Sequence, residues 1–177
     1  MAMFNRKFFI VPILTSALVI PLIITSSNSF AANTTMTLNI SGGGLSISAP
    51  ATIDFGSVTS GATATVTMGS VTVTDLRGVA AGGVWVTTAI ATALTKSDLS
   101  STITPTAMSY AAGTFTHTGT VTLTKTDVTD LTSAIAVVSA SAITGGNTGT
   151  WSPTMTVIVP IGTPNGAYSG SITQSVA

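Results

Sequence analysis

Few side chains in this sequence could carry acid–base or nucleophilic chemistry. The chain has one histidine, no cysteine and five acidic residues, all of them aspartates. A serine triad would need His117, which stands between two threonines in an alternating stretch typical of a solvated strand. Two aspartates can hydrolyse a glycoside, but these aspartates lie among expected turns and carry no further signature. The sequence therefore predicts a protein that is not an enzyme.

A metal site is also not expected. Thr126, Asp127, Thr129 and Asp130 offer oxygens for calcium, but such sites take about six to eight oxygens and several carboxylates. Two aspartates in a threonine-rich stretch are more often turn or helix-capping residues. One histidine without cysteine cannot build a thiolate or His-rich zinc site. We expect neither a metal nor a cofactor.

The remaining candidates are residues suited to binding. They are Trp85, Val86, Asp75, Arg77, Trp151 and Tyr168. An exposed tryptophan can stack on a sugar ring or anchor an interface, and the alternative for both tryptophans is a position in the core. Because neighbours on a strand face opposite sides, Trp85 and Val86 cannot both point inward.

Asp75 and Arg77 lie two residues apart, on one face of an expected strand end. They could clamp a polar ligand, or they could brace the turn over residues 78–83. A surface ion pair contributes only about 0–1 kcal/mol, so we favour a partly buried pair that braces the turn. For Asp54, beside the Gly56 turn, we expect an outward or turn-bracing role.

The N-terminus has the pattern of a secretory signal peptide. Arg6 and Lys7 precede an uncharged apolar run over residues 8–25, and Ser29 and Ala31 place small residues before a cleavage site. We expect residues 1–31 to be removed. The alternative is an uncleaved anchor, since a run of about 18 residues is just long enough to span a bilayer. In both cases the remainder is predicted to be extracellular or associated with the cell surface.

Charge excludes some partners. Only 6% of residues are charged, against about 25% in ordinary soluble domains. After cleavage three bases would face five aspartates, a net charge of −2. No basic field remains for nucleic acid or for an anionic membrane.

Hydrophobic periodicity predicts an all-β fold with little or no helix. Alternating stretches separated by glycine-rich turns are typical of an immunoglobulin-like antiparallel β-sandwich, here over residues 45–177. The alternating stretches cover residues 36–40, 45–48, 63–68, 70–74, 120–124, 155–159 and 168–172. Turns are predicted at Gly145-Gly146-Asn147 and, as a hairpin, at Asn165-Gly166. Residues 89–99 and 127–136 are the only helix candidates, and residues 132–142 are expected to form a strand.

Residues 32–44 form a separate N-terminal segment that ends in a glycine hinge at residues 42–44. The alternating residues 36–40 could be a strand of the body, a strand lent to a neighbouring subunit, or disordered. An exposed strand and an open sheet edge are complementary, which makes strand donation physically reasonable.

Three further stretches occur in a distinctive order. They are Ile53-Asp54-Phe55-Gly56, then Val73-Thr74-Asp75-Leu76-Arg77-Gly78 followed by Gly83-Val84-Trp85-Val86-Thr87, then Gly166-Ala167-Tyr168-Ser169-Gly170-Ser171-Ile172-Thr173. In order and spacing they resemble the WxL-type cell-surface domain of Gram-positive bacteria, over roughly residues 45–177. The likeness is greatest to short, single-domain secreted relatives. Val86 stands where the family has leucine, and Gln174-Ser175-Val176 stands where a second Trp motif is expected. The resemblance implies a β-sandwich that associates non-covalently with the cell wall.

Three functions remain open at this point. The first is a secreted, non-catalytic surface protein whose partner is a cell-wall polymer such as peptidoglycan, or another surface protein. The second is a self-assembling fibre subunit that donates residues 36–40. The third is a carbohydrate-binding adhesin module that uses exposed aromatic residues.

Overall fold

The computed structural model describes residues 35–40 and 42–177. The predicted signal peptide, residues 1–31, lies outside the described residues, so its cleavage stays a prediction. Residues 39–177 form one compact unit, called the body below, and residues 1–38 are a separate unit. Where the chain is described, no helix has the length and hydropathy that crossing a membrane requires.

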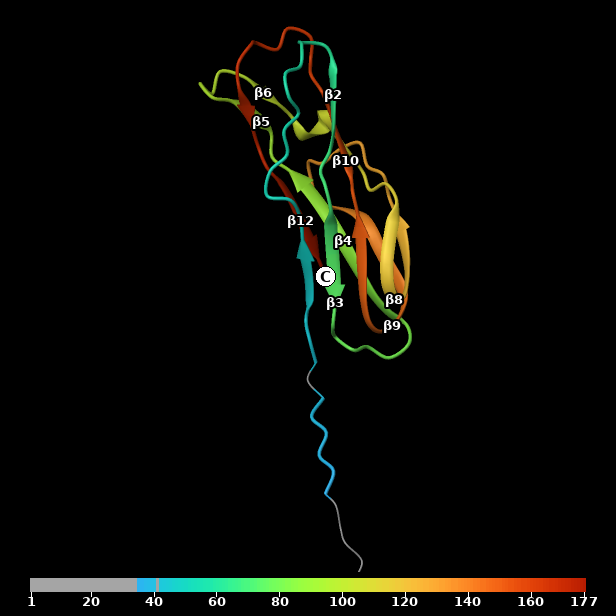
Figure 1. The fold of residues 1–177 in the computed structure, drawn as a ribbon. Coiled ribbons are helices and arrows are strands. Elements are labelled where there is room, and N and C mark those ends of the chain that lie inside the picture. Colours follow the sequence, from blue (N-terminus) through green and yellow to red (C-terminus); the bar gives the residue numbers. More distant parts are fainter. Residues whose placement is uncertain (1–34, 41) are drawn as a thin grey trace, which may run out of the picture. The chain divides into compact units, whose positions relative to one another are not determined.

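The body is all-β, as the periodicity predicted (Figure 1). Its strands are β1 (Leu45–Ser48), β2 (Thr63–Thr67), β3 (Val71–Asp75), β4 (Gly83–Ala91), β5 (Leu94–Lys96), β6 (Thr102–Ile103), β7 (Met108–Ala111), β8 (Phe115–Lys125), β9 (Ile135–Trp151), β10 (Thr154–Ile158), β11 (Tyr168–Ser169) and β12 (Ile172–Val176). The one helical element among the described residues is a single 3-10 turn, η1 (Pro105–Ala107). Both helix candidates are wrong: residues 89–99 contribute to β4 and β5, and residues 127–136 form a loop that leads into β9.

β9 is the central strand of the main sheet. β8 pairs along one edge of β9, and β3 and β4 pair with successive halves of the other edge. β1 then pairs with β3, and β12 pairs with β4, all antiparallel. The main sheet therefore has the order β1-β3-β9-β4-β12, with β8 attached to β9.

β9 continues through Gly145-Gly146-Asn147, where the sequence predicted a turn. That prediction is wrong because strands on both edges of β9 hold this stretch in the sheet. Bulges replace the turn: Ala142 and Gly145 have φ angles of 53° and 71°, and the opposing Gly119 on β8 has a φ of 72°. Bulges bend a strand without ending it, so one long two-stranded ribbon can follow the curvature of the main sheet.

A smaller sheet, β2-β10-β7, faces the main sheet, and a ribbon of short strands, β11-β5-β6, completes the body. The hairpin predicted at Asn165-Gly166 is absent. β10 precedes this stretch and β11 follows it, and the two strands belong to different sheets. The stretch is therefore a loop that crosses from one sheet to another.

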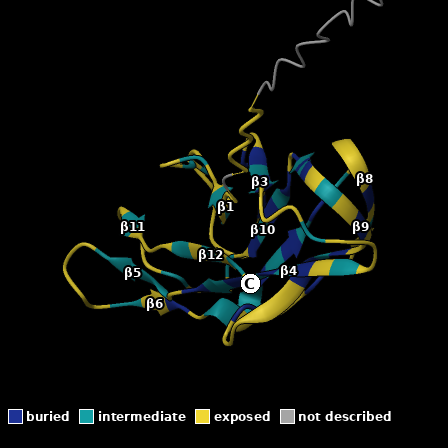
Figure 2. Ribbon diagram, turned by 90° about the horizontal axis from the view of Figure 1, so that it is seen from below, coloured by how far each residue is buried: buried dark blue, intermediate teal, exposed yellow. Residues whose placement is uncertain are grey.

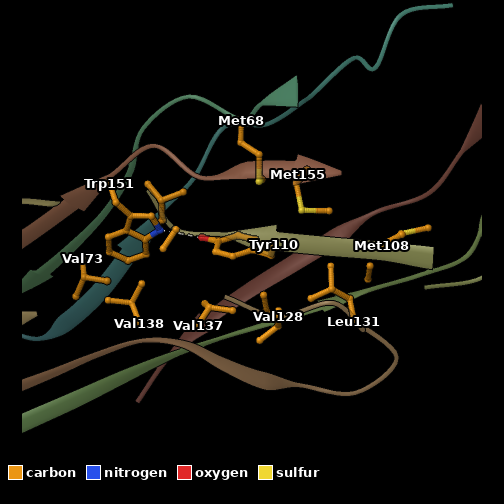
Figure 3. Packing of buried hydrophobic residues seen from close by; sticks show 14 of the residues in the cluster. Met68, Val73, Met108, Tyr110, Val128, Leu131, Val137, Val138, Trp151 and Met155 are labelled. Atoms are coloured by element: carbon orange, nitrogen blue, oxygen red, sulfur yellow. Dashed lines mark hydrogen bonds between the residues drawn. The ribbon is translucent and has the colours of Figure 1, made fainter. Parts of the chain in front are cut away.

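The main sheet and the β2-β10-β7 sheet share one hydrophobic core (Figure 3). Alternate residues of each strand point into it, so that β3 is buried at Val71, Val73 and Asp75 and only half-buried between them. Figure 2 shows the same alternation along most strands, whereas β8 is exposed over most of its length. The period-two pattern therefore assigned the inward positions of these strands correctly.

Residues 35–40 form no strand. The interpretation of residues 36–40 as a strand of the body is therefore wrong, although their alternation is as regular as that of β10. The first backbone hydrogen bond of this part of the chain to the body is made by Gly43, whose N–H donates to the carbonyl of Leu76, the residue after β3. The side chains of Met36, Leu38 and Ile40 are 93%, 85% and 83% exposed.

Candidate functional site

Both tryptophans lie in the core. Trp85 on β4 and Trp151 at the end of β9 are 0% and 1% exposed. Their rings stack with centroids 6.5 Å apart and planes 19° from parallel, and Phe115 meets Trp151 edge-on. This placement agrees with the core alternative, and neither indole offers a face to a sugar ring.

Asp75 is buried at the end of β3 and holds Arg77 through three hydrogen bonds. Its Oδ1 accepts from the backbone N–H of Arg77 at 3.0 Å and from Nε at 2.9 Å, and its Oδ2 accepts from Nη2 at 2.9 Å. These bonds from Arg77 hold the pKa of Asp75 below its usual value. Arg77 Nη2 also donates to the carbonyl of Val84, at 2.9 Å, across the loop between β3 and β4. The pair thus braces this loop, as the favoured interpretation predicted.

The Asp75 carboxylate is also the first member of a chain of hydrogen bonds that runs into the core. Asn147 donates from Nδ2 to Asp75 Oδ2 at 3.4 Å, and Trp85 donates from Nε1 to Asn147 Oδ1 at 3.3 Å. This chain of bonds joins the ends of β3 and β4 to the middle of β9. Its members satisfy one another, and no buried side-chain polar atom of the described residues lacks a partner.

Tyr110 forms a second buried link that the sequence did not reveal. Trp151 Nε1 donates to the Tyr110 hydroxyl at 2.8 Å, the bond drawn in Figure 3. The hydroxyl in turn donates to Gln174 Oε1 at 2.9 Å. Burial raises the pKa of Tyr110 to about 12. Because β7 belongs to the smaller sheet and β9 and β12 to the main sheet, the hydroxyl ties the two sheets together.

Val86 and Tyr168 are half-buried. Val86 exchanges two backbone hydrogen bonds with Ala177, of 2.9 and 3.1 Å, which fasten the C-terminal residue to β4. The Tyr168 hydroxyl donates to the carbonyl of Pro164 at 3.0 Å. Of the six predicted binding residues, Tyr168 is the one that lines the groove described below.

The other carboxylates stabilise turns. Asp54, Asp98 and Asp130 each accept a hydrogen bond from the backbone N–H two residues later. The pKa of Asp98 is lowered mainly by the hydrogen bond from Lys96, and that of Asp130 mainly by the backbone N–H of Thr132. Asp127 accepts from the N–H of Ala112 at 3.3 Å. Within the described part of the chain, no three residues of the metal-ligating types come together.

A groove of about 670 Å³ opens into the core between the smaller sheet and the loops that precede β2 and β11. Buried residues of the smaller sheet line it: Ala64 on β2, Met108 on β7, and Met155 and Val157 on β10. Residues 53–58 and 163–172 line much of the rest, together with Ser60, Ala91, Thr92, Leu94, Ile103 and Val159, and Asp54 is the only charged residue in the lining. The groove is therefore suited to apolar side chains more than to a charged ligand.

Residues 51–58 run past this groove without the pairing of a strand, and residues 53–58 line it. Ile53 and Phe55 are half-buried and pack against the core, while Thr52, Asp54 and Gly56 are exposed. No backbone-to-backbone hydrogen bond involves any of these eight residues. The segment covers apolar surface through Ile53 and Phe55 without any backbone pairing of its own.

A second surface is the solvent-facing side of the β8–β9 ribbon, on which hydroxyl residues face each other in five pairs. The pairs are Thr116 with Thr150, Thr118 with Thr148, Thr120 with Thr144, Thr122 with Ser141, and Thr124 with Ser139. The rows at Thr150 and Thr148 continue across β3 and β1 as Thr72 and Ser48, and as Thr74 and Ser46. Hydroxyl oxygens lie 2.7 Å apart in the Thr118–Thr148 pair and 3.0 Å apart in the Thr72–Thr150 pair.

The threonine alternation over residues 116–124 was visible in the sequence as a strand signal, but its partners on β9 were not. The predicted turn at Gly145 separated Thr144 from Thr148 and concealed that both lie on one strand. His117 is exposed on β8 between two of these threonines, as predicted.

Comparison with known proteins gives no assignment. A scan of the chain against protein-family models and searches of curated proteins and of solved structures found no match.

Proposed function

We propose that this chain is an exported, non-catalytic structural subunit whose copies associate at the cell surface into a fibre or coat. The observation that supports this proposal is the segment over residues 36–40. It alternates apolar and polar side chains as a half-buried strand does, yet it pairs with nothing in the described structure and exposes Met36, Leu38 and Ile40. Exposed apolar residues in such a row are typical of an interaction segment.

The composition of the body supports association as well. Copies of a chain with 6% charged residues repel one another little. β2 ends the smaller sheet, and β8 and β12 have one described strand partner each, whereas the outer edge of β7 is bridged to Val128 through Tyr110. Unpaired edges of this kind accept a strand from another molecule unless charge, proline or a covering segment blocks them.

The proposal is tested by Leu38→Asp in the chain that begins at Ala32. Leu38 is 85% exposed, so the substitution leaves the fold of the monomer intact while it places a charge on the interacting face. The matched control is Leu99→Asp, at a loop position 78% exposed. We expect the parent and Leu99→Asp to form polymers that sediment, and Leu38→Asp to stay monomeric with unchanged thermal stability. Polymers of Leu38→Asp that match those of the parent would refute the role of this segment.

Association with the cell wall is a second candidate, favoured by the paired hydroxyls on β8 and β9. Ten serine and threonine side chains of that ribbon offer donors and acceptors to a neutral glycan without charge repulsion. The resemblance to WxL-type domains agrees with this candidate. An adhesin that uses exposed tryptophans is not supported, because both indoles are buried.

Co-sedimentation with purified peptidoglycan sacculi tests the second candidate. Thr118→Val and Thr148→Val together remove one hydroxyl pair and keep the β-branched shape. The wall candidate predicts that the parent pellets only with sacculi and that the double variant binds less. Equal pelleting of the two proteins would remove the β8–β9 ribbon as the binding surface.

A further inference from the structure

We infer that the groove beneath residues 51–58 is the acceptor for residues 36–40 of a second copy, which pair with the free edge of β2. This inference rests on the proposed self-association and specifies its interface. In it, residues 51–58 are a resident cover that the incoming strand moves aside.

The groove and the segment match in the chemistry of their side chains. On β2, Ala64 is buried and Val66 is half-buried, while Thr63, Thr65 and Thr67 are exposed. Residues 36–40 show the same alternation, with Met36, Leu38 and Ile40 separated by Thr37 and Asn39. A strand beside β2 would therefore place its apolar side chains over the groove and its polar side chains in solvent.

Their lengths match as well. β2 has five residues, and residues 36–40 would extend over the same distance of about 17 Å at about 3.4 Å per residue. Ala64 is the one residue of β2 that lines the groove, and its small side chain leaves space there for a larger neighbour. β2 itself has one described partner, β10, and its second edge is unpaired.

The resident segment is a weak competitor for this position. Ile53 and Phe55 cover part of the groove, but residues 51–58 make no backbone-to-backbone hydrogen bonds. A donated strand would add backbone pairing to β2 and bury three further apolar side chains. Both gains favour the assembled form, because residues 51–58 lose no backbone pairing when they move aside.

The interface can be mapped by disulfide formation, because the chain has no cysteine of its own. One protein carries Asn39→Cys and the other carries Thr63→Cys, Thr65→Cys or Thr67→Cys, all at solvent-facing positions. Opposed residues of antiparallel strands have Cα atoms about 4.5–5.5 Å apart, within the range of about 4.4–6.8 Å that a disulfide spans. The control protein carries Thr118→Cys on β8, an exposed position on a different open edge.

We expect mixtures of the Asn39→Cys protein with a β2 variant to give disulfide-linked heterodimers, and the mixture with Thr118→Cys to give none. Heterodimers with Thr118→Cys alone would overturn the assignment of the groove. Polymers that form in all mixtures without any β2 disulfide would also overturn it, and would leave the proposed self-association intact. Absence of both polymers and disulfides would refute the proposed function together with its interface.

Discussion

Asp75 and Tyr110 place polar groups inside a core that is otherwise mostly apolar. Each of them links elements that lie far apart in the sequence. Asp75 joins the loop after β3 to β9 through Arg77 and Asn147. Tyr110 joins the two sheets through Trp151 and Gln174. The aspartate–arginine pair was predictable from its spacing. The tyrosine link was not, because its partners lie 41 and 64 residues away along the chain.

Asp75→Asn is expected to destabilise the body. Loss of one partner of a buried ion pair costs about 3–5 kcal/mol, and the lower end applies because the Arg77 side chain is 33% exposed. Asp98→Asn is the control, since Asp98 forms an i, i+2 pair with Lys96 but is 54% exposed. Solvent screens an exposed pair, so its loss should change stability little. Urea unfolding of both variants distinguishes them, and equal losses would contradict the bracing role of Asp75.

The same substitution should change the response to acid. Because the pKa of Asp75 is lower in the folded state, its contribution is present above the ordinary carboxylate range and is lost as pH falls through the lowered pKa. The difference in unfolding free energy between the parent and Asp75→Asn should therefore shrink in acid. A constant difference from neutral pH down to strongly acidic pH would show that the charge of Asp75 contributes nothing.

Tyr110→Phe is expected to cost about 1–3 kcal/mol at neutral pH, because Trp151 and Gln174 each lose a hydrogen-bond partner. The folded-state pKa of about 12 lies above the usual value of 10.0. The stability linked to this shift is present below pH 10 and is lost as pH rises toward 12. Thermal melts over this range should show alkaline destabilisation that Tyr110→Phe reduces and Tyr168→Phe does not. The same alkaline profile in all three proteins would contradict this account.

At the scale of elements, the β8–β9 ribbon depends on backbone positions that only glycine tolerates well. Gly119 has a φ of 72°, and a Cβ there would collide with the carbonyl oxygen of Gly146 on the opposing strand. The alternating pattern predicted strands on both sides of this point. It did not predict the bulge, because a glycine pair is equally typical of a turn.

Gly119→Ala is therefore expected to be much more destabilising than Gly78→Ala. Gly78 also has a positive φ, 64°, but nothing lies within 4 Å of the position of a Cβ. Gly78→Ala should cost about 1 kcal/mol from backbone strain alone, and Gly119→Ala should cost more because opposing backbone must move. Chemical denaturation measures both. Equal costs would show that β8 and β9 are not held together at this bulge.

At the scale of the molecule, period-two alternation was enough to predict an all-β body, because one buried face imposes it on nearly every strand. The same alternation failed for residues 36–40, which have the pattern of a strand but no partner within the described structure. The groove could not be predicted either, since it is formed by the smaller sheet together with residues 53–58 and 163–172, which are distant in sequence. Residues 36–40 have no strand partner among the described residues, and residues 51–58 cover the groove without backbone pairing. These two features together motivate the proposed assembly.

Hydrogen exchange of residues 36–40, measured in the monomer and in the assembled protein, shows whether this segment pairs with a strand edge on assembly. Amides of an unpaired segment exchange fast, whereas amides paired with a strand edge are protected. If the strand is donated, residues 36–40 become protected on assembly while residues 51–58 stay unprotected. An assembled protein in which residues 36–40 exchange as fast as in the monomer would contradict strand donation.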